Sequence, residues 1–136
     1  MTLGDEGINR VRDLIAGDLY KGQKGTGTTV PTTSDTALES AVAATSKDLS
    51  YSLEDKQITI THEIPATDGN GNTLSEGNIE LGDAGTQYQL IRYTHHGVIK
   101  SASDEQVTIV RLFLRNNGWK KTILLSVKWR YILWGD

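Results

Sequence analysis

Apolar and polar residues alternate through most of the second half of the chain. From Gln57 to Ile64, three isoleucines and His62 fall on one side and polar residues fall on the other. This period of two is typical of a strand with one buried face. A shorter alternation over residues 49–53 predicts a preceding strand, and residues 74–81 and 88–99 are expected to form two more.

The end of the chain predicts a hairpin. Asn117-Gly118 is a preferred pair for a two-residue type I′ turn, and apolar runs flank it. A turn at this pair would place Leu114 opposite Lys121 and Leu112 opposite Ile123. One face would then form part of the core, with these members: Val110, Leu112, Leu114, Ile123, Leu125, Val127, Trp129, Tyr131 and Leu133.

The opposite face of this hairpin mixes basic residues such as Arg111 with large apolar ones. The apolar members are Ile109, Phe113, Leu124, Ile132 and Trp134. A solvated sheet face does not normally carry so many large apolar side chains. We therefore expect a second sheet, the N-terminal helix or another subunit to cover it, and these residues are the candidate subunit interface.

The first part of the chain predicts a helix and a loop. A helix is expected over Asp5 to Ala16, with Asp5 capping its first turn and Gly17 ending it. Its apolar face would consist of Ile8, Val11, Leu14 and Ile15. Tyr20 to Lys24 is expected to form a short strand, and a helical turn is expected within Thr36 to Ala44.

These elements predict one mainly β domain spanning residues 1–136. The helix and a Gly/Thr-rich loop would occupy about residues 1–45. An antiparallel, jelly-roll-like β-sandwich would occupy about residues 46–136.

Composition excludes several classes of protein and site. The chain of 136 residues has a net charge of −3 and no cysteine. Disulfides and thiolate metal sites are therefore excluded, and no basic cluster indicates nucleic-acid binding. No apolar run predicts a signal peptide or a membrane span, so we expect the protein to be made in the cytoplasm and to have no membrane partner.

One segment has the beginning of a calcium loop. Asp68, Asn70 and Asn72 place oxygen-bearing side chains at alternate positions, as a hard cation requires. Thr73 and Ile79 then stand where an EF-hand has glycine and glutamate. A turn explains the segment, and a non-EF calcium site at Asp68, Asn70 and Asn72 is the alternative.

Candidate catalytic groups are scattered. His95 and His96 are adjacent in a predicted strand, so they would point to opposite faces, and His62 lies among isoleucines. No serine has the setting of a nucleophile elbow, and no glycine pattern matches a nucleotide loop. We expect no catalytic residue, no metal and no cofactor, and a hydrolase that uses surface carboxylates is the enzymatic alternative.

The loop from Gly25 to Leu38 has no apolar periodicity. Its backbone must be held by its own side chains and by neighbours. Gly25 and Gly27 are expected to adopt conformations that a β-carbon disfavours. Pro31 lies within the loop, and Asp35 is expected to fix it by accepting backbone hydrogen bonds.

The pattern Gly-Thr-Gly-Thr-Thr-x-Pro-x-x-x-Asp-Thr-x-Leu in this loop resembles a signature of small structural proteins of tailed viruses. These are proteins of the tail-fibre and baseplate-associated kind. Further matches follow in order: Asn70-Gly71-Asn72 with Glu76, Leu90-Ile91-Arg92, and Ile99-Lys100. The chain departs from the family at Gly77-Asn78-Ile79, where the family has Gly-Leu-Phe.

The resemblance implies a non-enzymatic virion component of the tail, baseplate or fibre that forms homo-oligomers and contacts other virion proteins. A capsid decoration or turret protein is an alternative placement. A β-sandwich module that binds a host glycan or receptor is an alternative function, with Trp119 or Trp134 as stacking platforms.

Overall fold

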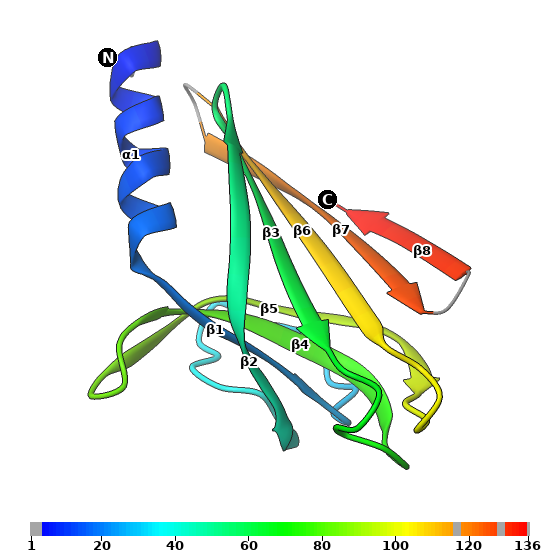
Figure 1. Ribbon diagram of the computed structural model, residues 1–136. Coiled ribbons are helices and arrows are strands. Elements are labelled where there is room, and N and C mark those ends of the chain that lie inside the picture. The colour runs from blue at the N-terminus through cyan, green and yellow to red at the C-terminus, as the bar shows by residue number, and fades with distance from the viewer. Residues whose placement is uncertain (1–3, 116–117, 128–129, 136) are drawn as a thin grey trace.

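The computed structural model describes residues 4–115, 118–127 and 130–135, with side chains as far as Arg115. Within these residues the chain forms one helix followed by strands (Figure 1). The elements are α1 (Asp5–Asp18), β1 (Leu19–Gly25), β2 (Ala41–Glu54), β3 (Gln57–Ile64), β4 (Thr73–Gly82), β5 (Gln87–Ile99), β6 (Gln106–Arg115), β7 (Gly118–Val127) and β8 (Arg130–Gly135).

The strands form one antiparallel sheet of eight strands in the order β5-β4-β1-β2-β3-β6-β7-β8. The long β2 joins its halves, because residues 41–48 pair with β1 and residues 49–54 pair with β3. The sheet curls so that β1, β4 and β5 run across its lower end (Figure 1). The predicted mainly β class with an N-terminal helix is confirmed. The predicted sandwich of two separate sheets is not, since β2 makes the sheet continuous.

The core lies where the two halves of the sheet and α1 meet. Alternate residues of β3 and β6 are buried there, together with residues of β4, β5 and α1. The buried cluster consists of Ala16, Ile58, Ile60, Ile79, Tyr93, Val110 and Leu112. Burying one such aliphatic side chain contributes roughly 1.5–3 kcal/mol to folding. The predicted inner faces of β3 and β6 are therefore confirmed.

The predicted helix is also confirmed, although its ends and its apolar face differ. It continues beyond Gly17 to Asp18, and the capping residue is Gly4, which makes no side-chain cap. Asp5 instead forms an ion pair with Lys56 at 2.7 Å. The helical turn predicted within Thr36 to Ala44 is wrong: a loop without helix leads into β2, which begins at Ala41.

The apolar face of α1 is only partly buried. Ile8 is 2% exposed, whereas Val11 and Leu14 are 46% and 57% exposed. Polar contacts with the β2–β3 turn orient the helix: Asn9 accepts a hydrogen bond from the backbone N–H of Lys56 at 2.8 Å. The described part of the chain contains no helix long and apolar enough to cross a membrane.

The register of the β6–β7 hairpin differs from the prediction by two residues. Arg115 pairs with Gly118, so Gly118 belongs to β7 rather than to a turn. Leu112 consequently lies opposite Lys121, and Leu114 lies opposite Trp119. A shift of two residues leaves each position on its predicted face.

The predicted face assignment of β8 is wrong. Leu124 pairs with Leu133, whereas Ile132 and Trp134 lie opposite Leu125 and Ile123. Opposite residues share a face of the sheet, so Ile132 and Trp134 occupy core-face positions. The reason is that Val127 pairs with Arg130, which reverses the alternation that the prediction continued through residues 123–134.

Candidate functional site

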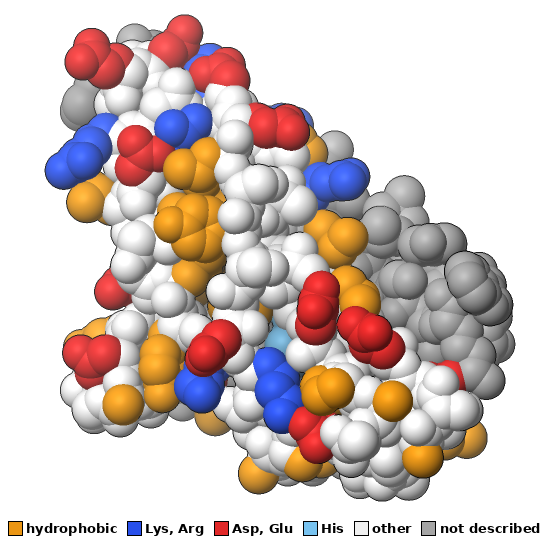
Figure 2. All heavy atoms as spheres, viewed as in Figure 1, with side chains coloured by type: hydrophobic (Ala, Val, Ile, Leu, Met, Phe, Trp, Pro, Cys, Tyr) orange, Lys and Arg blue, Asp and Glu red, His pale blue; other side chains and the backbone are white. Residues whose placement is uncertain are grey.

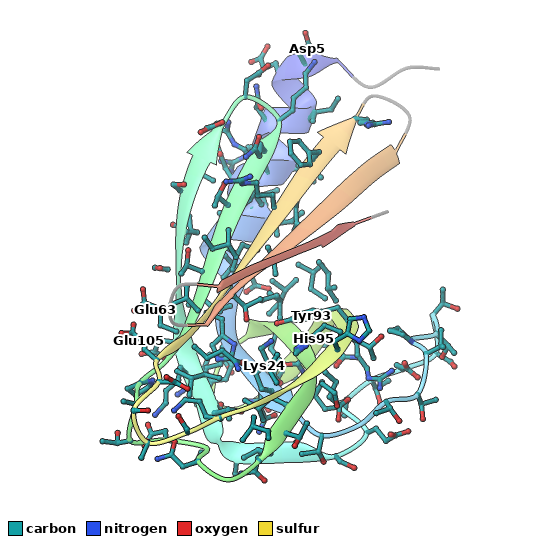
Figure 3. The ribbon with its side chains drawn as sticks, turned by 90° about the vertical axis from the view of Figure 1, so that its right-hand side faces the viewer. Asp5, Lys24, Glu63, Tyr93, His95 and Glu105 are labelled. Carbon is teal, nitrogen blue, oxygen red and sulfur yellow. The ribbon has the colours of Figure 1, made fainter. Side chains whose placement is uncertain are left out.

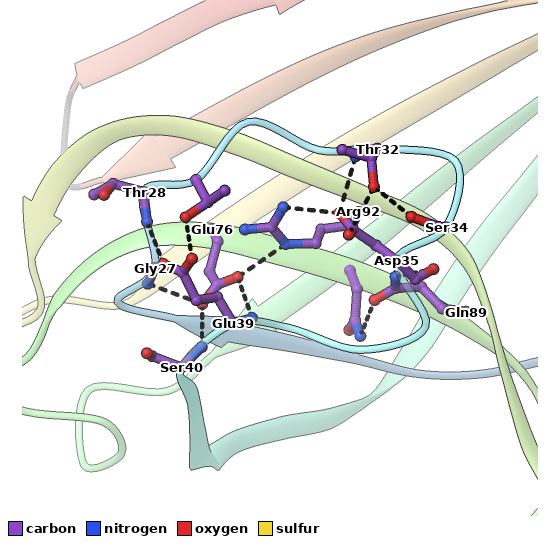
Figure 4. Close-up of polar contacts among 12 residues, drawn as sticks. Gly27, Thr28, Thr32, Ser34, Asp35, Glu39, Ser40, Glu76, Gln89 and Arg92 are labelled. Carbon is purple, nitrogen blue, oxygen red and sulfur yellow. Dashed lines mark hydrogen bonds and ion pairs between the residues drawn. The ribbon is translucent and has the colours of Figure 1, made fainter.

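A buried carboxylate on the sheet binds the backbone of the loop between β1 and β2. Glu76 on β4 is fully buried, and its Oε2 accepts hydrogen bonds from the backbone N–H groups of Gly27 at 2.8 Å and Ser40 at 2.7 Å. Its Oε1 accepts the backbone N–H of Glu39 at 2.9 Å. One side chain therefore ties both ends of the loop to the sheet (Figure 4).

Arg92 on β5 extends this network to the middle of the loop. Its Nε donates to Glu76 Oε1, and its Nη1 donates to Asp35 Oδ2, each at 3.1 Å. Asp35 in turn accepts the backbone N–H and the hydroxyl of Thr32, both at 2.9 Å. The prediction that Asp35 fixes the loop by accepting a backbone hydrogen bond is confirmed. We call Asp35, Glu76 and Arg92 the loop clamp.

Electrostatics keep the carboxylates of the loop clamp ionised. Burial alone would raise the pKa of Glu76, but hydrogen bonds from three backbone N–H groups and from Arg92 outweigh it and hold this pKa below its usual value. The N–H and hydroxyl of Thr32 likewise lower the pKa of Asp35. A carboxylate with this many donors is a poor proton acceptor, so the clamp suits a structural role better than general-base catalysis.

Gly25 and Gly27 are required because Glu76 lies so close to them. Neither glycine has a positive φ, so the expected unusual backbone conformation is not the reason for glycine. A β-carbon at Gly25 would lie 2.4 Å from the carbonyl oxygen of Ser40, and one at Gly27 would lie 2.5 Å from Glu76 Oε2. The glycines thus allow the backbone to approach the carboxylate.

Above the clamp, the loop exposes small hydroxyl-bearing residues. Thr28, Thr29, Thr32, Thr33 and Ser34 are exposed, and Val30 is 75% exposed. Pro31 is half-buried. The hydroxyl of Thr29 donates to Glu39, which pins a second point of the loop. The clamp therefore presents an ordered polar surface with one apolar side chain.

Lysines occupy the candidate calcium loop. The ammonium of Lys100 donates to Asn70 Oδ1 at 2.9 Å, to the carbonyl oxygen of Ala66 at 3.2 Å and to that of Ser101 at 3.1 Å. Asp68 forms an ion pair with Lys47. Asn72 donates to the carbonyl oxygen of Gly69, as a turn residue does. The proposed oxygen ligands are thus engaged by ammonium groups and a backbone turn.

A second buried polar cluster lies between the halves of the sheet. Lys24 on β1 is fully buried, and its Nζ lies 2.9 Å from His95 Nε2 and 5.0 Å from the centre of the Tyr93 ring (Figure 3). His95 Nδ1 lies 2.7 Å from the carbonyl oxygen of His96, to which it must donate, so Nε2 is the acceptor for Lys24. Burial lowers the pKa of Lys24 to about 7.

His62 on β3 completes this cluster. Its Nε2 lies 2.8 Å from the carbonyl oxygen of Thr45, whose hydroxyl also accepts the backbone N–H of Lys24. Burial, reinforced by the charge of Lys24, lowers the pKa of His62 to about 4. The pKa of His95 falls to about 3, mainly through burial. We call Lys24, His62, Tyr93 and His95 the polar layer.

Among the candidate interface residues, Ile109 and Phe113 lie half-buried on the face of β6 opposite the core. The side chains of Leu124, Ile132 and Trp134 lie outside the described residues, as do those of Trp119 and the other late aromatics. The register brings Leu124 next to Ile109 but places positions 132 and 134 on the other face. The five predicted residues are therefore not brought together as one patch.

The described residues contain no group of three or more histidine, cysteine or acidic side chains that could hold a metal. Comparison with protein-family models, with curated proteins and with solved structures finds no match.

Sequence reasoning did not predict the ion pair of Glu76 with Arg92 or the burial of Lys24. The sequence did contain a signal for the ion pair, because Glu76 and Arg92 both belong to the motifs of the resemblance. The sequence contained no signal for the burial of Lys24, since a lone lysine in a short strand usually reaches solvent.

Proposed function

We propose that this protein is a non-enzymatic structural component of a tailed virus, placed in the tail, baseplate or fibre. One observation carries the proposal: the scattered motifs of the resemblance meet in space. Gly25, Gly27, Asp35, Glu76 and Arg92 form the clamped loop, although they come from the β1–β2 loop, β4 and β5.

Lys100 and Asn70 support the same proposal. They belong to two further motifs and bond to each other at 2.9 Å. Motifs that are held together by their contacts reflect a shared fold more strongly than short matches along a chain. These contacts support the resemblance on which the proposal rests.

The chemistry of the clamp favours assembly over catalysis. Its charges are engaged by backbone groups and by one another, and the loop above it exposes hydroxyls and Val30. A preordered loop loses little conformational entropy when a neighbouring protein binds. We infer that the loop contacts other virion proteins.

Fractionation of particles tests the proposal. Cells that produce the virus would be lysed, and particles would be purified on a density gradient and separated into heads and tails. We expect the protein in the particles, with the tail fraction, in stoichiometric amounts. Recovery with the heads would favour the capsid decoration or turret alternative, and absence from purified particles would contradict a virion role.

A further inference from the structure

The face of β3 and β6 that points away from the core has an apolar middle. We call it the outer face. Val107, Ile109 and Phe113 lie there half-buried on β6, and Thr59 and Thr61 lie beside them on β3. Half-buried apolar residues on a sheet still have surface that a second layer can remove from water.

Opposite charges lie toward the two ends of the outer face, with Ile109 between them and Phe113 between the two arginines. Arg111 and Arg115 are exposed toward one end, and Glu63 and Glu105 are exposed at the other. Glu63 pairs with Val107, four residues before Arg111, so the two charges are separated by roughly 13 Å along the strands. Glu63 and Glu105 lie side by side in Figure 3, and acidic side chains gather beside apolar ones on the front face in Figure 2.

These four charges have no partner within the described part of the chain. None of them forms an ion pair or a hydrogen bond there. By contrast, Asp48 on the neighbouring β2 pairs with Lys21. Glu54 also lies near the basic end, but it belongs to β2. The acidic and basic ends described here are therefore those of β3 and β6 alone.

A surface with an apolar middle and opposite charges at its ends is complementary to itself. If a second copy is turned end for end, its acidic end meets the basic end of the first copy, and the apolar middles meet each other. A two-fold axis that lies midway between the two sheets, parallel to them and perpendicular to the strands, produces this arrangement. Sheets packed face to face lie about 10 Å apart, a span that arginine and glutamate side chains can bridge together.

We propose that two copies of this chain pack through their outer faces about such a two-fold axis. Arg111 and Arg115 of each copy then pair with Glu63 and Glu105 of the other, around a centre that includes Ile109. The inference deepens the assembly role proposed above and rests on it for its biological meaning. The experiment uses the isolated chain, so pairing in solution and incorporation into particles can fail separately.

Charge reversal and mixing test the arrangement. The basic pair is reversed in Arg111→Glu/Arg115→Glu, and the acidic pair is reversed in Glu63→Lys/Glu105→Lys. Sedimentation equilibrium measures the dimer dissociation constant of each protein alone and of an equimolar mixture. We expect the unchanged chain to dimerise, each reversed variant to dissociate with a constant more than tenfold higher, and the mixture to recover a heterodimer.

Controls separate pairing from folding and from general charge effects. Arg10→Glu reverses an exposed charge on α1 and is expected to leave the dissociation constant unchanged. Circular dichroism reports whether each variant folds. Should a double variant fold poorly, the single variants Arg111→Glu and Glu63→Lys provide the same comparison. A monomeric unchanged chain at about 1 mM, reversed variants that dimerise as tightly as the unchanged chain, or a mixture that stays monomeric would overturn the proposal.

Discussion

Lys24 is a basic residue that is buried in the folded protein. Its amine is fully buried, and the described surroundings supply the neutral Nε2 of His95 and the face of Tyr93 rather than a carboxylate. Removing an ammonium from water without a counter-charge is unfavourable, which is why the pKa of Lys24 falls to about 7. At this residue, the folded protein gives up stability to keep a polar group inside.

This cost predicts a pH dependence of stability. The lysine pKa is 10.5 when solvated and about 7 in the folded chain, so the unfolded chain binds the extra proton between these values. The free energy of unfolding should therefore rise with pH, by at most about 1.4 kcal/mol per unit, from about pH 7 to 10.5. Lys24→Met should flatten this rise and stabilise the protein at pH 7 by roughly 1–4 kcal/mol.

Urea unfolding at several pH values measures this effect. Lys21→Met, which changes a half-buried lysine of the same strand, is the control. Equal pH slopes for Lys24→Met and the unchanged chain would show that the Lys24 amine is not responsible.

At the scale of elements, alternation in the sequence predicted those strands that have one inner face. The isoleucines of β3 and Val110 and Leu112 of β6 are buried as expected. The register of the last strands was not predictable in the same way. Asn117-Gly118 is a strong turn signal, yet Gly118 pairs with Arg115 as part of β7. The pairing of Val127 with Arg130 then reverses the alternation in β8. Local preferences compete there with pairing over the whole strand.

The loop clamp likewise shows that local sequence signals do not predict contacts between distant residues. Sequence indicated that Asp35 holds the loop, because Asp side chains commonly accept nearby backbone N–H groups. The contact between Gly27 and Glu76 joins residues 49 positions apart, so only the fold reveals why glycine is needed.

Two glycine substitutions distinguish a glycine required by close packing from one that is not. Gly27→Ala places a β-carbon 2.5 Å from Glu76 Oε2 and 2.6 Å from the β-carbon of Glu39, so it should destabilise the protein by roughly 1–3 kcal/mol. Gly7→Ala lies in α1 with open space around it and should stabilise the protein by about 0.5–1 kcal/mol. Thermal unfolding of both variants measures the difference. Equal melting temperatures would mean that the loop gives way without cost.

At the scale of the whole molecule, curling of the sheet places strands distant in the sequence around one interior. Part of that interior is aliphatic, around Ile58, Ile60, Val110 and Leu112. The polar layer instead consists of side chains from β1, β3 and β5, of which Figure 3 labels Lys24, Tyr93 and His95. Sequence predicted the mainly β class because alternation is local. It did not predict the curl, since this depends on β2 being long enough to pair with β1 at one end and β3 at the other.

The position of the polar layer predicts that acid loosens the junction of the two halves. His62 has a folded pKa of about 4 and an ordinary pKa of 6.5, so the unfolded chain holds more protons between these values. Stability contributed by neutral His62 should therefore be lost as the pH falls from 6.5 to 4, by roughly 3 kcal/mol in total. The charges of Lys24 and Lys47 account for part of this loss, because both lower the pKa of His62, whereas burial accounts for the largest part.

His62→Gln removes the titrating group and should reduce the pH dependence between 4 and 6.5, although it also lowers stability at pH 7. Hydrogen exchange locates the loosening: backbone amides of β1 and β3 around the polar layer should lose protection before those of β6 in the aliphatic core. Because the pKa of His95 is lowered to about 3, this variant should still lose stability in acid, although less than the unchanged chain does. Uniform loss of protection over the whole sheet would show that the halves unfold together and that the polar layer does not divide them.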